Sequence, residues 1–201
     1  MMQRGGSLDR VTFKGVIFDL DGTLVESSLD FQSIRQEIGC PDSVDSLTFI
    51  ESQSPDRQAA LFRILYRHEM RDAATAKWLG DAKEFVEYLH AQAIPMAIVT
   101  RNQKAAVRLK LENNRIPIDL VFTREDAKPK PDPSALNRIA QIWQLPEHKL
   151  VYVGDYLYDI LTAERAKLAS CLLAKGKRPD YAYRADIVIT KLMNLAPHIE
   201  G

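Results

Sequence analysis

Short apolar runs alternate with amphipathic segments along most of this chain. Six runs have the length and composition of buried β-strands, and they lie at Gly15–Phe18, Met96–Val99, Leu120–Phe122, Leu150–Val153, Ser170–Leu173 and Ile187–Ile189. Apolar residues at helical spacing predict helices between them at Asp81–Ala91, Gln103–Asn113, Pro133–Trp143 and Tyr156–Lys167. Because strands that are apolar throughout are typical of sheets covered on both faces, the alternation predicts an α/β fold with helices on both faces of a parallel sheet.

One region interrupts this alternation. Residues 25–79 show no clear strand, and two or three helices follow one another there. Ser54 is a typical N-cap and Pro55 a typical first helical residue, so we expect a long helix to begin at this point. We therefore predict a core domain formed by residues 1–24 and 80–201, with a small helical insertion formed by residues 25–79.

Composition narrows the range of partners and locations. The 201 residues include 27 basic and 27 acidic side chains, so the formal net charge is zero. This balance disfavours nucleic acid or an anionic membrane as the main partner, because both usually require a basic excess. No apolar run approaches the length of a bilayer span, and Met1–Arg10 contain no signal-peptide core. Cys40 and Cys171 are far apart and outside any CxxC pair, so we expect reduced thiols in a cytoplasmic protein.

The first predicted strand ends in two carboxylates, Asp19 and Asp21, which are one residue apart. Such groups are costly to bury unless a cation accompanies them. At a separation of about 4 Å, two carboxylates repel each other by roughly 4 kcal/mol at a surface-like effective dielectric. A divalent cation would reverse this interaction and would also attract a phosphate dianion. The pair therefore indicates a divalent-metal site.

Further polar residues lie at the ends of later strands or just before a predicted helix, and these are Thr100-Arg101-Asn102, Lys128–Asp132 and Asp155–Asp159. Ligands of open parallel sheets bind beyond the carboxyl ends of the strands, so we expect these segments to converge. Asp19, Asp21 and Asp155 offer the oxygen ligands that magnesium prefers. A hydroxyl from Thr100 and a lysine would bind phosphoryl oxygens. The set indicates phosphoryl transfer.

Taken together, the segments FDLDGTL, VTRN, KPKPDP and VGDYLYD resemble the haloacid dehalogenase (HAD) superfamily, in the family's order and over nearly the whole chain. The resemblance is closest to the branch of phosphoglycolate phosphatases and β-phosphoglucomutases, in which a helical cap follows the first motif. It implies a Rossmann-like α/β core with a helical C1 cap, a Mg²⁺ cofactor and a small phosphate ester as substrate. It leaves the oligomeric state and the individual substrate open.

The resemblance also implies a role for each acidic residue. Asp19 would be the nucleophile that forms an aspartyl-phosphate, and it would also bind the metal. Asp21 would protonate the leaving alcohol, activate the hydrolytic water and give its backbone carbonyl to the metal. Asp155 would complete the Mg²⁺ ligands. Asp159 would either support that site from one helical turn further on or be a simple first-turn acid at a helix N-terminus.

Other residues are expected to bind the phosphoryl group or the rest of the substrate. Thr100 would bind phosphoryl oxygens, with Arg101 and Asn102 as further substrate contacts. Lys128 and Lys130 both fit the lysine of the third motif, and we favour Lys128. Lys130 would point to the alternate side if this segment were extended.

Three arginines on the predicted insertion allow two interpretations. Arg63, Arg67 and Arg71 share one helix face, which favours a solvated surface over a clamp for an anionic substrate.

Three functions are compatible with these motifs. We favour a Mg²⁺-dependent phosphatase that acts on a phosphoglycolate-like or sugar-phosphate-like metabolite. Asp21 supports phosphate chemistry, because the haloalkanoic-acid dehalogenases of this superfamily lack an aspartate at that place. A β-phosphoglucomutase-like phosphomutase is the main alternative, and a non-catalytic phospho-aspartate relative is a weaker one.

Overall fold

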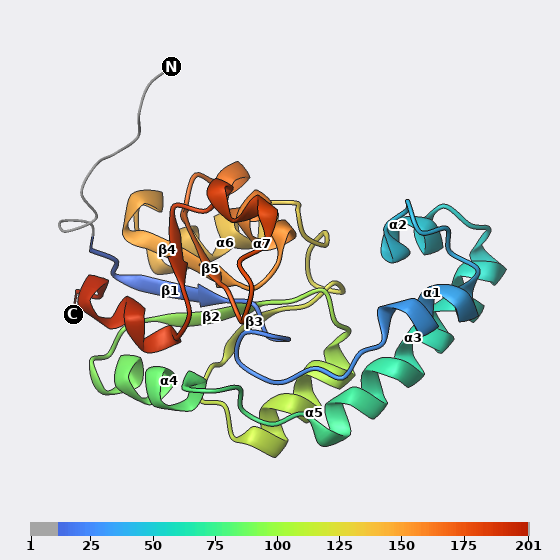
Figure 1. Ribbon diagram of the computed structural model, residues 1–201, viewed down its shortest axis with the longest axis horizontal. Helices are drawn as coiled ribbons and strands as arrows, with labels where there is room; N and C mark the ends of the chain where they lie inside the picture. The colour runs from blue at the N-terminus through green and yellow to red at the C-terminus, as the bar shows by residue number, and fades with distance from the viewer. Residues whose placement is uncertain (1–11, 201) are drawn as a thin grey trace.

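The computed structural model describes residues 12–200 (Figure 1). The segment Met1–Arg10, considered above for a targeting signal, lies outside the described residues. Between residues 12 and 200, no helix is both long and apolar enough to span a membrane.

The described part of the chain forms one six-stranded parallel sheet with the order β3-β2-β1-β4-β5-β6. The strands are β1 (Gly15–Phe18), β2 (Met96–Val99), β3 (Leu120–Phe122), β4 (Leu150–Gly154), β5 (Ala169–Leu173) and β6 (Ile187–Ile189). The predicted parallel sheet is confirmed. Because β1 pairs with both β2 and β4, the residues that follow these three strands meet at the middle of one sheet edge.

Four helices cover the two faces of this sheet, and they are α4 (Ala82–Ala91), α5 (Lys104–Asn114), α6 (Ser134–Trp143) and α7 (Leu157–Ala166). Each begins one residue later than predicted, because the residue expected to be first is the N-cap. Short 3-10 helices lie at Glu147–Lys149, Asp180–Arg184 and Leu192–His198.

The alternating directions of the β1 side chains explain why helices cover both faces of the sheet. Val16 and Phe18 belong to a buried cluster that includes Phe85 of α4, whereas Ile17 belongs to the cluster that includes Leu136 of α6. Successive side chains of a strand point to opposite faces, so an entirely apolar strand requires helices on both sides. Figure 1 shows α6 and α7 on one side of the sheet and α4 and α5 on the other.

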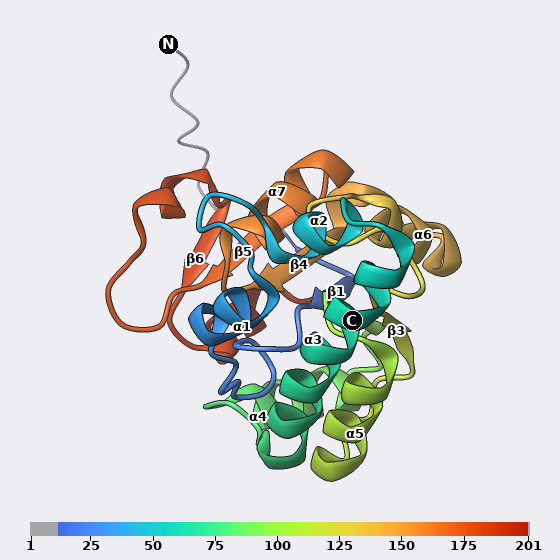
Figure 2. The same ribbon diagram turned by 90° about the vertical axis from the view of Figure 1, so that its right-hand side faces the viewer.

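Residues 25–79 contain three helices, which are α1 (Phe31–Ile38), α2 (Ser46–Glu51) and α3 (Pro55–Thr75). They share a hydrophobic cluster that is separate from those on the sheet, built on Ile34, Ile38, Leu47, Ile50, Leu61 and Leu65. Figure 2 shows α1 and α2 near one end of α3, while the C-terminal half of α3 lies beside α5.

Two adjacent backbone segments connect these helices to the sheet. The Glu26 N–H donates to the Lys77 carbonyl at 2.8 Å, and the Leu79 N–H donates to the Leu24 carbonyl at 2.9 Å. The chain thus leaves and re-enters the core as a short antiparallel pair, which fixes the starting points of α1–α3 relative to β1.

We predict that Ile50→Ala loosens α1 and α2 without loosening the sheet. Ile50 is fully buried in the helical cluster, and an Ile→Ala change in a core costs about 2–5 kcal/mol. Hydrogen exchange followed by mass spectrometry should show faster exchange in residues 31–51 and unchanged exchange in β1 and β4. The matched control is Ile139→Ala, a fully buried residue of the sheet cluster, which should accelerate exchange in the strands. Equal acceleration everywhere in Ile50→Ala would contradict separate helical and sheet units.

Candidate active site

A cavity of about 860 Å³ lies at the carboxyl ends of the central strands, between the sheet and α1–α3. It is lined by most of the residues singled out from the sequence, namely Asp19, Asp21, Thr100, Arg101, Asn102, Asp155 and Asp159. These residues come from three loops that follow β1, β2 and β4 and from the first turn of α7. The topology of the sheet therefore brings together residues that are more than a hundred positions apart.

A buried lysine lies at the centre of the site. Lys130 Nζ lies 2.7 Å from Asp19 Oδ1 and 2.7 Å from Asp159 Oδ1. Asp159 also accepts hydrogen bonds from the Tyr152 hydroxyl at 3.1 Å and the Tyr156 N–H at 3.0 Å. Because its oxygens already have these donors, Asp159 is held in place as a support for Lys130.

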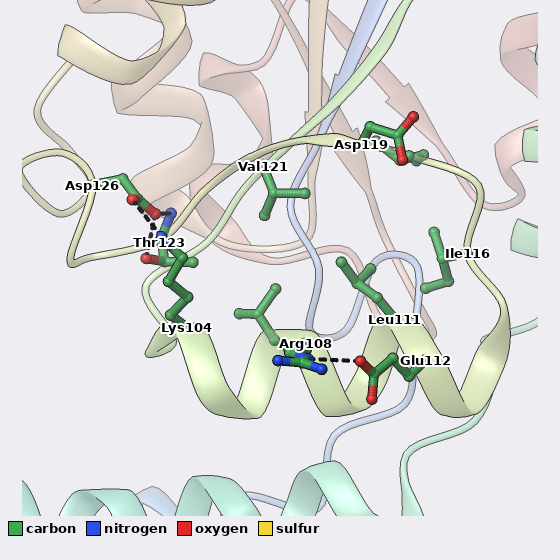
Figure 3. Close-up of a pocket in the computed structure, with 11 residues that line it drawn as sticks. Lys104, Arg108, Leu111, Glu112, Ile116, Asp119, Val121, Thr123 and Asp126 are labelled. Carbon is green, nitrogen blue, oxygen red and sulfur yellow. Dashed lines mark hydrogen bonds and ion pairs between the residues drawn. The ribbon is translucent and has the colours of Figure 1, made fainter.

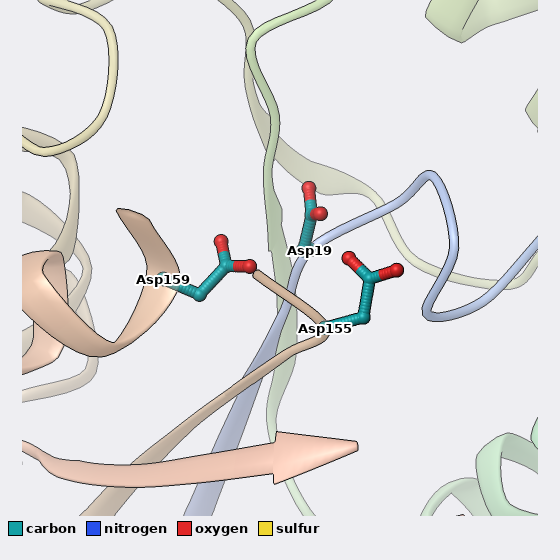
Figure 4. Close-up of side chains that lie close together, drawn as sticks. All are labelled: Asp19, Asp155 and Asp159. Atoms are coloured by element: carbon teal, nitrogen blue, oxygen red, sulfur yellow. The ribbon is translucent and has the colours of Figure 1, made fainter. Parts of the chain in front are cut away.

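Three carboxylates converge next to this lysine. One oxygen from each of Asp19, Asp155 and Asp159 can be chosen so that all three lie within 4.8 Å of one another. Figure 4 shows their side chains projecting toward a common region from the ends of β1 and β4 and from α7. The donors are all carboxylate oxygens, which suit a hard divalent cation rather than a soft metal.

Burial makes it unfavourable for the carboxyl groups of this cluster to be charged together without a cation. Burial raises the pKa of Asp19 to about 8, in spite of the opposing effect of Lys130. Burial also raises the pKa of Asp155, with Lys175 opposing the shift. For Lys130 burial acts to lower the pKa, but Asp159 and Asp19 outweigh it and the pKa is raised. One buried ammonium does not balance three carboxylates, so the donor set fits an additional cation.

The structure places Lys130 at the site and Lys128, the favoured lysine of the third motif, away from it. Lys128 is exposed and does not line the cavity, whereas Lys130 is buried against Asp19. The segment is not extended here, because the Asp132 N–H donates to the Pro129 carbonyl at 3.1 Å. This bond closes a turn, so the alternation of an extended strand does not apply and Lys130 points inward.

Asp21 has partners different from those of Asp19. Its carboxylate accepts hydrogen bonds from Lys110 Nζ of α5 and from the Asn102 side-chain amide. Lys110 is fully buried and also lies 2.6 Å from Asp72 Oδ2 on α3. Burial raises the pKa of Asp21, and Lys110 opposes this shift. The two carboxylates at the end of β1 are thus held by two different lysines.

Helix α3 is joined to the core by two buried ion pairs. Asp72 pairs with Lys110, and Glu69 pairs with Arg124 of the loop after β3. Sequence reasoning missed Lys110, Glu69 and Asp72 because none of them lies in a motif. Each one lies at a buried position of its helix, among residues such as Val107 and Leu65. The signal that could have revealed them is a charged residue at a helix position where the spacing of apolar residues predicts burial.

The loop after β2 contributes residues with different environments. Thr100 is buried, and its Oγ1 accepts a hydrogen bond from the Asn102 N–H at 3.2 Å. Arg101 Nη2 lies 2.7 Å from both carboxylate oxygens of Asp45, the N-cap of α2. The Arg101 guanidinium also lies over the Tyr158 ring, at 4.9 Å from its centroid. Arg101 therefore connects the loop after β2 to the start of α2.

The arginines of α3 do not contribute to this site. Arg63, Arg67 and Arg71 are exposed and do not line the cavity, and Arg67 pairs with Glu37 of α1. The interpretation as a solvated face is therefore confirmed.

A second cavity of about 430 Å³ lies between α5 and the β3 edge of the sheet (Figure 3). Val121, Leu111 and Ile116 contribute apolar surface, while Arg108 pairs with Glu112 at its rim. None of the carboxylates of the Asp19 cluster lines it. The Asp19, Asp155 and Asp159 carboxylates thus line only the larger of these two cavities.

Comparison with known proteins agrees with this geometry. Residues 16–173 match the family of haloacid dehalogenase-like hydrolases. A phosphoglycolate phosphatase of Cereibacter sphaeroides is 33% identical over 82% of this chain and 86% of its own length. A haloacid dehalogenase-like hydrolase domain-containing protein of Arabidopsis thaliana is 26% identical over 92% of this chain and 84% of its own.

Solved structures show the same fold. A hydrolase from Pseudomonas syringae superposes with a TM-score of 0.76, and the match covers 92% of this chain and 96% of that one. Its sequence identity is 21%, so this likeness concerns the fold alone.

We predict that Asp19→Asn stabilises the protein in the presence of a chelator as the pH approaches 8. The pKa of Asp19 is raised from 3.8 to about 8 by folding, so wild-type stability falls as the pH rises through that interval. Replacing Asp19 with asparagine removes this pH-dependent loss of stability. Thermal unfolding at pH 8 should give a Tm at least about 3 °C higher than wild type, with little difference near pH 4. Asp119→Asn removes an exposed carboxylate and should leave the pH dependence unchanged. A lower Tm for Asp19→Asn at pH 8 would contradict an excess of buried negative charge.

Proposed function

The chain belongs to the haloacid dehalogenase-like hydrolase family, and on this premise we propose that it is a Mg²⁺-dependent phosphatase acting on a small phosphate monoester. One observation carries the proposal. Asp19 and Asp21 follow the same strand and line the same cavity, yet Asp19 is held by Lys130 and Asp21 by Lys110 and Asn102. Two carboxylates in separate environments can perform separate tasks.

In the first half-reaction Asp19 acts as the nucleophile. Its Oδ1 is engaged by Lys130, so we assign the attack on phosphorus to Oδ2. A bond forms between this oxygen and phosphorus while the ester P–O bond breaks, and Asp21 gives a proton to the departing alkoxide. The product is an alcohol together with an aspartyl-phosphate on Asp19.

In the second half-reaction Asp21 acts as a base. It takes a proton from a water molecule as the water oxygen attacks phosphorus, and the bond between phosphorus and Asp19 breaks. Inorganic phosphate leaves, and both aspartates regain their starting protonation. General acid–base catalysis of this kind typically contributes about 10² to 10⁴ in rate.

Cations and hydroxyls would stabilise the phosphoryl oxygens during both steps. The ammonium of Lys130 lies beside Asp19, and we assign the hydroxyl of Thr100 as a further donor from the opposite loop. Mg²⁺ would be held by Asp19, Asp155 and the backbone carbonyl of Asp21, and when bound it supplies positive charge where transition-state charge develops. Asp159 would keep Lys130 in place without contacting the reacting atoms.

The substrate is a small metabolite in this proposal. The cavity volume of about 860 Å³ lies within the range of small-molecule sites. The relative from Cereibacter sphaeroides is a phosphoglycolate phosphatase, which makes phosphoglycolate and short sugar phosphates the first compounds to test. Arg101 and Asn102, beside Thr100, are the proposed contacts for the part of the substrate beyond the phosphoryl group.

The proposal is tested with a panel of phosphate monoesters and Mg²⁺, with release of inorganic phosphate as the readout. We expect turnover of at least one small metabolite, a loss of more than about 10³-fold in Asp19→Asn, and a loss of about 10² to 10⁴-fold in Asp21→Asn. Metal binding should survive in Asp21→Asn, because the proposed ligand is its backbone carbonyl. Isomerisation of a sugar phosphate without phosphate release would identify a mutase instead. Near-normal phosphatase rates in Asp21→Asn would refute the acid–base role.

The position of Lys130 beside Asp19 leads to a second prediction about phosphatase activity. Lys130→Met should reduce phosphatase activity by at least about 10²-fold, because it leaves the Asp19 and Asp159 carboxylates without their buried partner. Lys130→Arg keeps the charge and should retain more activity than Lys130→Met. Lys128→Met makes the same change at an exposed position two residues away, and its kcat/KM should stay within about twofold of wild type. The reverse order of effects would restore Lys128 as the functional lysine.

A further inference from the structure

A second lysine contacts the carboxylate cluster from its exposed side. Lys175 follows β5, and its ammonium lies 3.2 Å from Asp155 Oδ2 and also donates a hydrogen bond to the Gly22 carbonyl oxygen. About 41% of its side chain is exposed, compared with 5% for Lys130. The reaction described above assigns no step to Lys175, although this residue contacts a proposed metal ligand directly.

The two oxygens that bind Lys175 belong to one compact arrangement. Gly22 has a φ of +73°, and a Cβ at this position would overlap the Asp155 carboxylate. The backbone of the turn after β1 therefore lies directly against Asp155. A carbonyl oxygen next to a carboxylate oxygen is a favourable environment for a cation, and in this structure the cation is the Lys175 ammonium.

The loop that carries Lys175 is loosely packed at the next residue. Gly176 has a φ of +73°, and among the described residues other than its two chain neighbours none comes within 4 Å of the place that a Cβ would occupy there. The half-exposed ammonium can therefore leave Asp155 for solvent without displacing packed side chains. Lys130 differs in this respect, because it is buried between two carboxylates.

We propose that Lys175 competes with the metal ion for Asp155 and thereby sets the affinity of the site. This inference rests on the metal site of the proposed function. A dication at Asp155 would repel a neighbouring ammonium, so metal binding requires Lys175 to withdraw. When no metal is bound, Lys175 offsets part of the negative charge of Asp155 and keeps it against the turn at Gly22. The metal therefore binds more weakly than it would to the same carboxylates without this lysine.

The test measures metal binding directly, without substrate. Mn²⁺ is titrated into the metal-free protein, and free Mn²⁺ is quantified by electron paramagnetic resonance. The rise of Tm with added Mg²⁺ serves as a second measurement. Lys175→Met should lower the Kd for Mn²⁺ about tenfold and should shift the Mg²⁺ dependence of Tm to lower concentration. Lys175→Arg keeps the positive charge and should stay within about twofold of wild type.

A matched control separates the contact from the general charge of the loop. Lys177 lies two residues further on and is exposed, so Lys177→Met removes the same charge from the same loop. Its Kd should stay within about twofold of wild type. Equal tightening in both methionine variants would mean that only the net charge of the loop matters, which would overturn the proposal.

Two further outcomes are decisive. If Lys175→Met binds Mn²⁺ no more tightly than wild type, the competition does not exist. A raised KM for substrate in that variant would then identify Lys175 as a substrate ligand instead. Asp155→Asn checks the premise separately, because unchanged Mn²⁺ binding in this variant would refute the proposed metal site whatever Lys175 does.

Discussion

The concentration of buried carboxylates at the end of β1 is the constraint on which the rest of this structure depends. Asp19, Asp155 and Asp159 converge because β1 and β4 end side by side and α7 begins directly after β4. Their desolvation and mutual repulsion oppose folding, and both effects raise the pKa of Asp19, to about 8. Lys130 offsets part of this opposition from within, which explains why a lysine is buried at that point. The same excess of charge that weakens the fold makes the site attractive to a cation and to a phosphoryl group beside it.

A second set of charges determines where the helical segment lies. The ion pairs of Asp72 with Lys110 and of Glu69 with Arg124 join α3 to the sheet domain through groups that are almost fully buried. Breaking one partner of such a pair is costly, because the remaining charge has no water around it. Helix α3 is therefore a fixed wall of the cavity. By contrast, α2 contacts the loop after β2 through the more exposed pair of Asp45 and Arg101.

The sequence predicted the sheet, its flanking helices and the convergence of Asp19, Asp21, Thr100 and Asp155, because strand periodicity and parallel topology determine where strand ends meet. The sequence did not predict residues whose positions depend on contacts between distant segments rather than on the local pattern of residues. An extended segment would favour Lys128 over Lys130, but a turn closed by Asp132 and Pro129 places Lys130 beside Asp19. Lys110 lies at a buried position of α5, and its place among apolar residues was a signal of burial. Its partners Asp21 and Asp72 come from other elements, so the spacing within α5 does not reveal them.

The ion pair between Arg101 and Asp45 can break without disturbing the start of α2. Asp45 Oδ1 also accepts the Thr48 N–H at 3.1 Å and so begins α2. If Arg101 turns away toward an anionic ligand, this hydrogen bond remains and the helix keeps its first turn. Such a movement would exchange one contact of Asp45 while the other persists, and α2 would not have to unfold and reform.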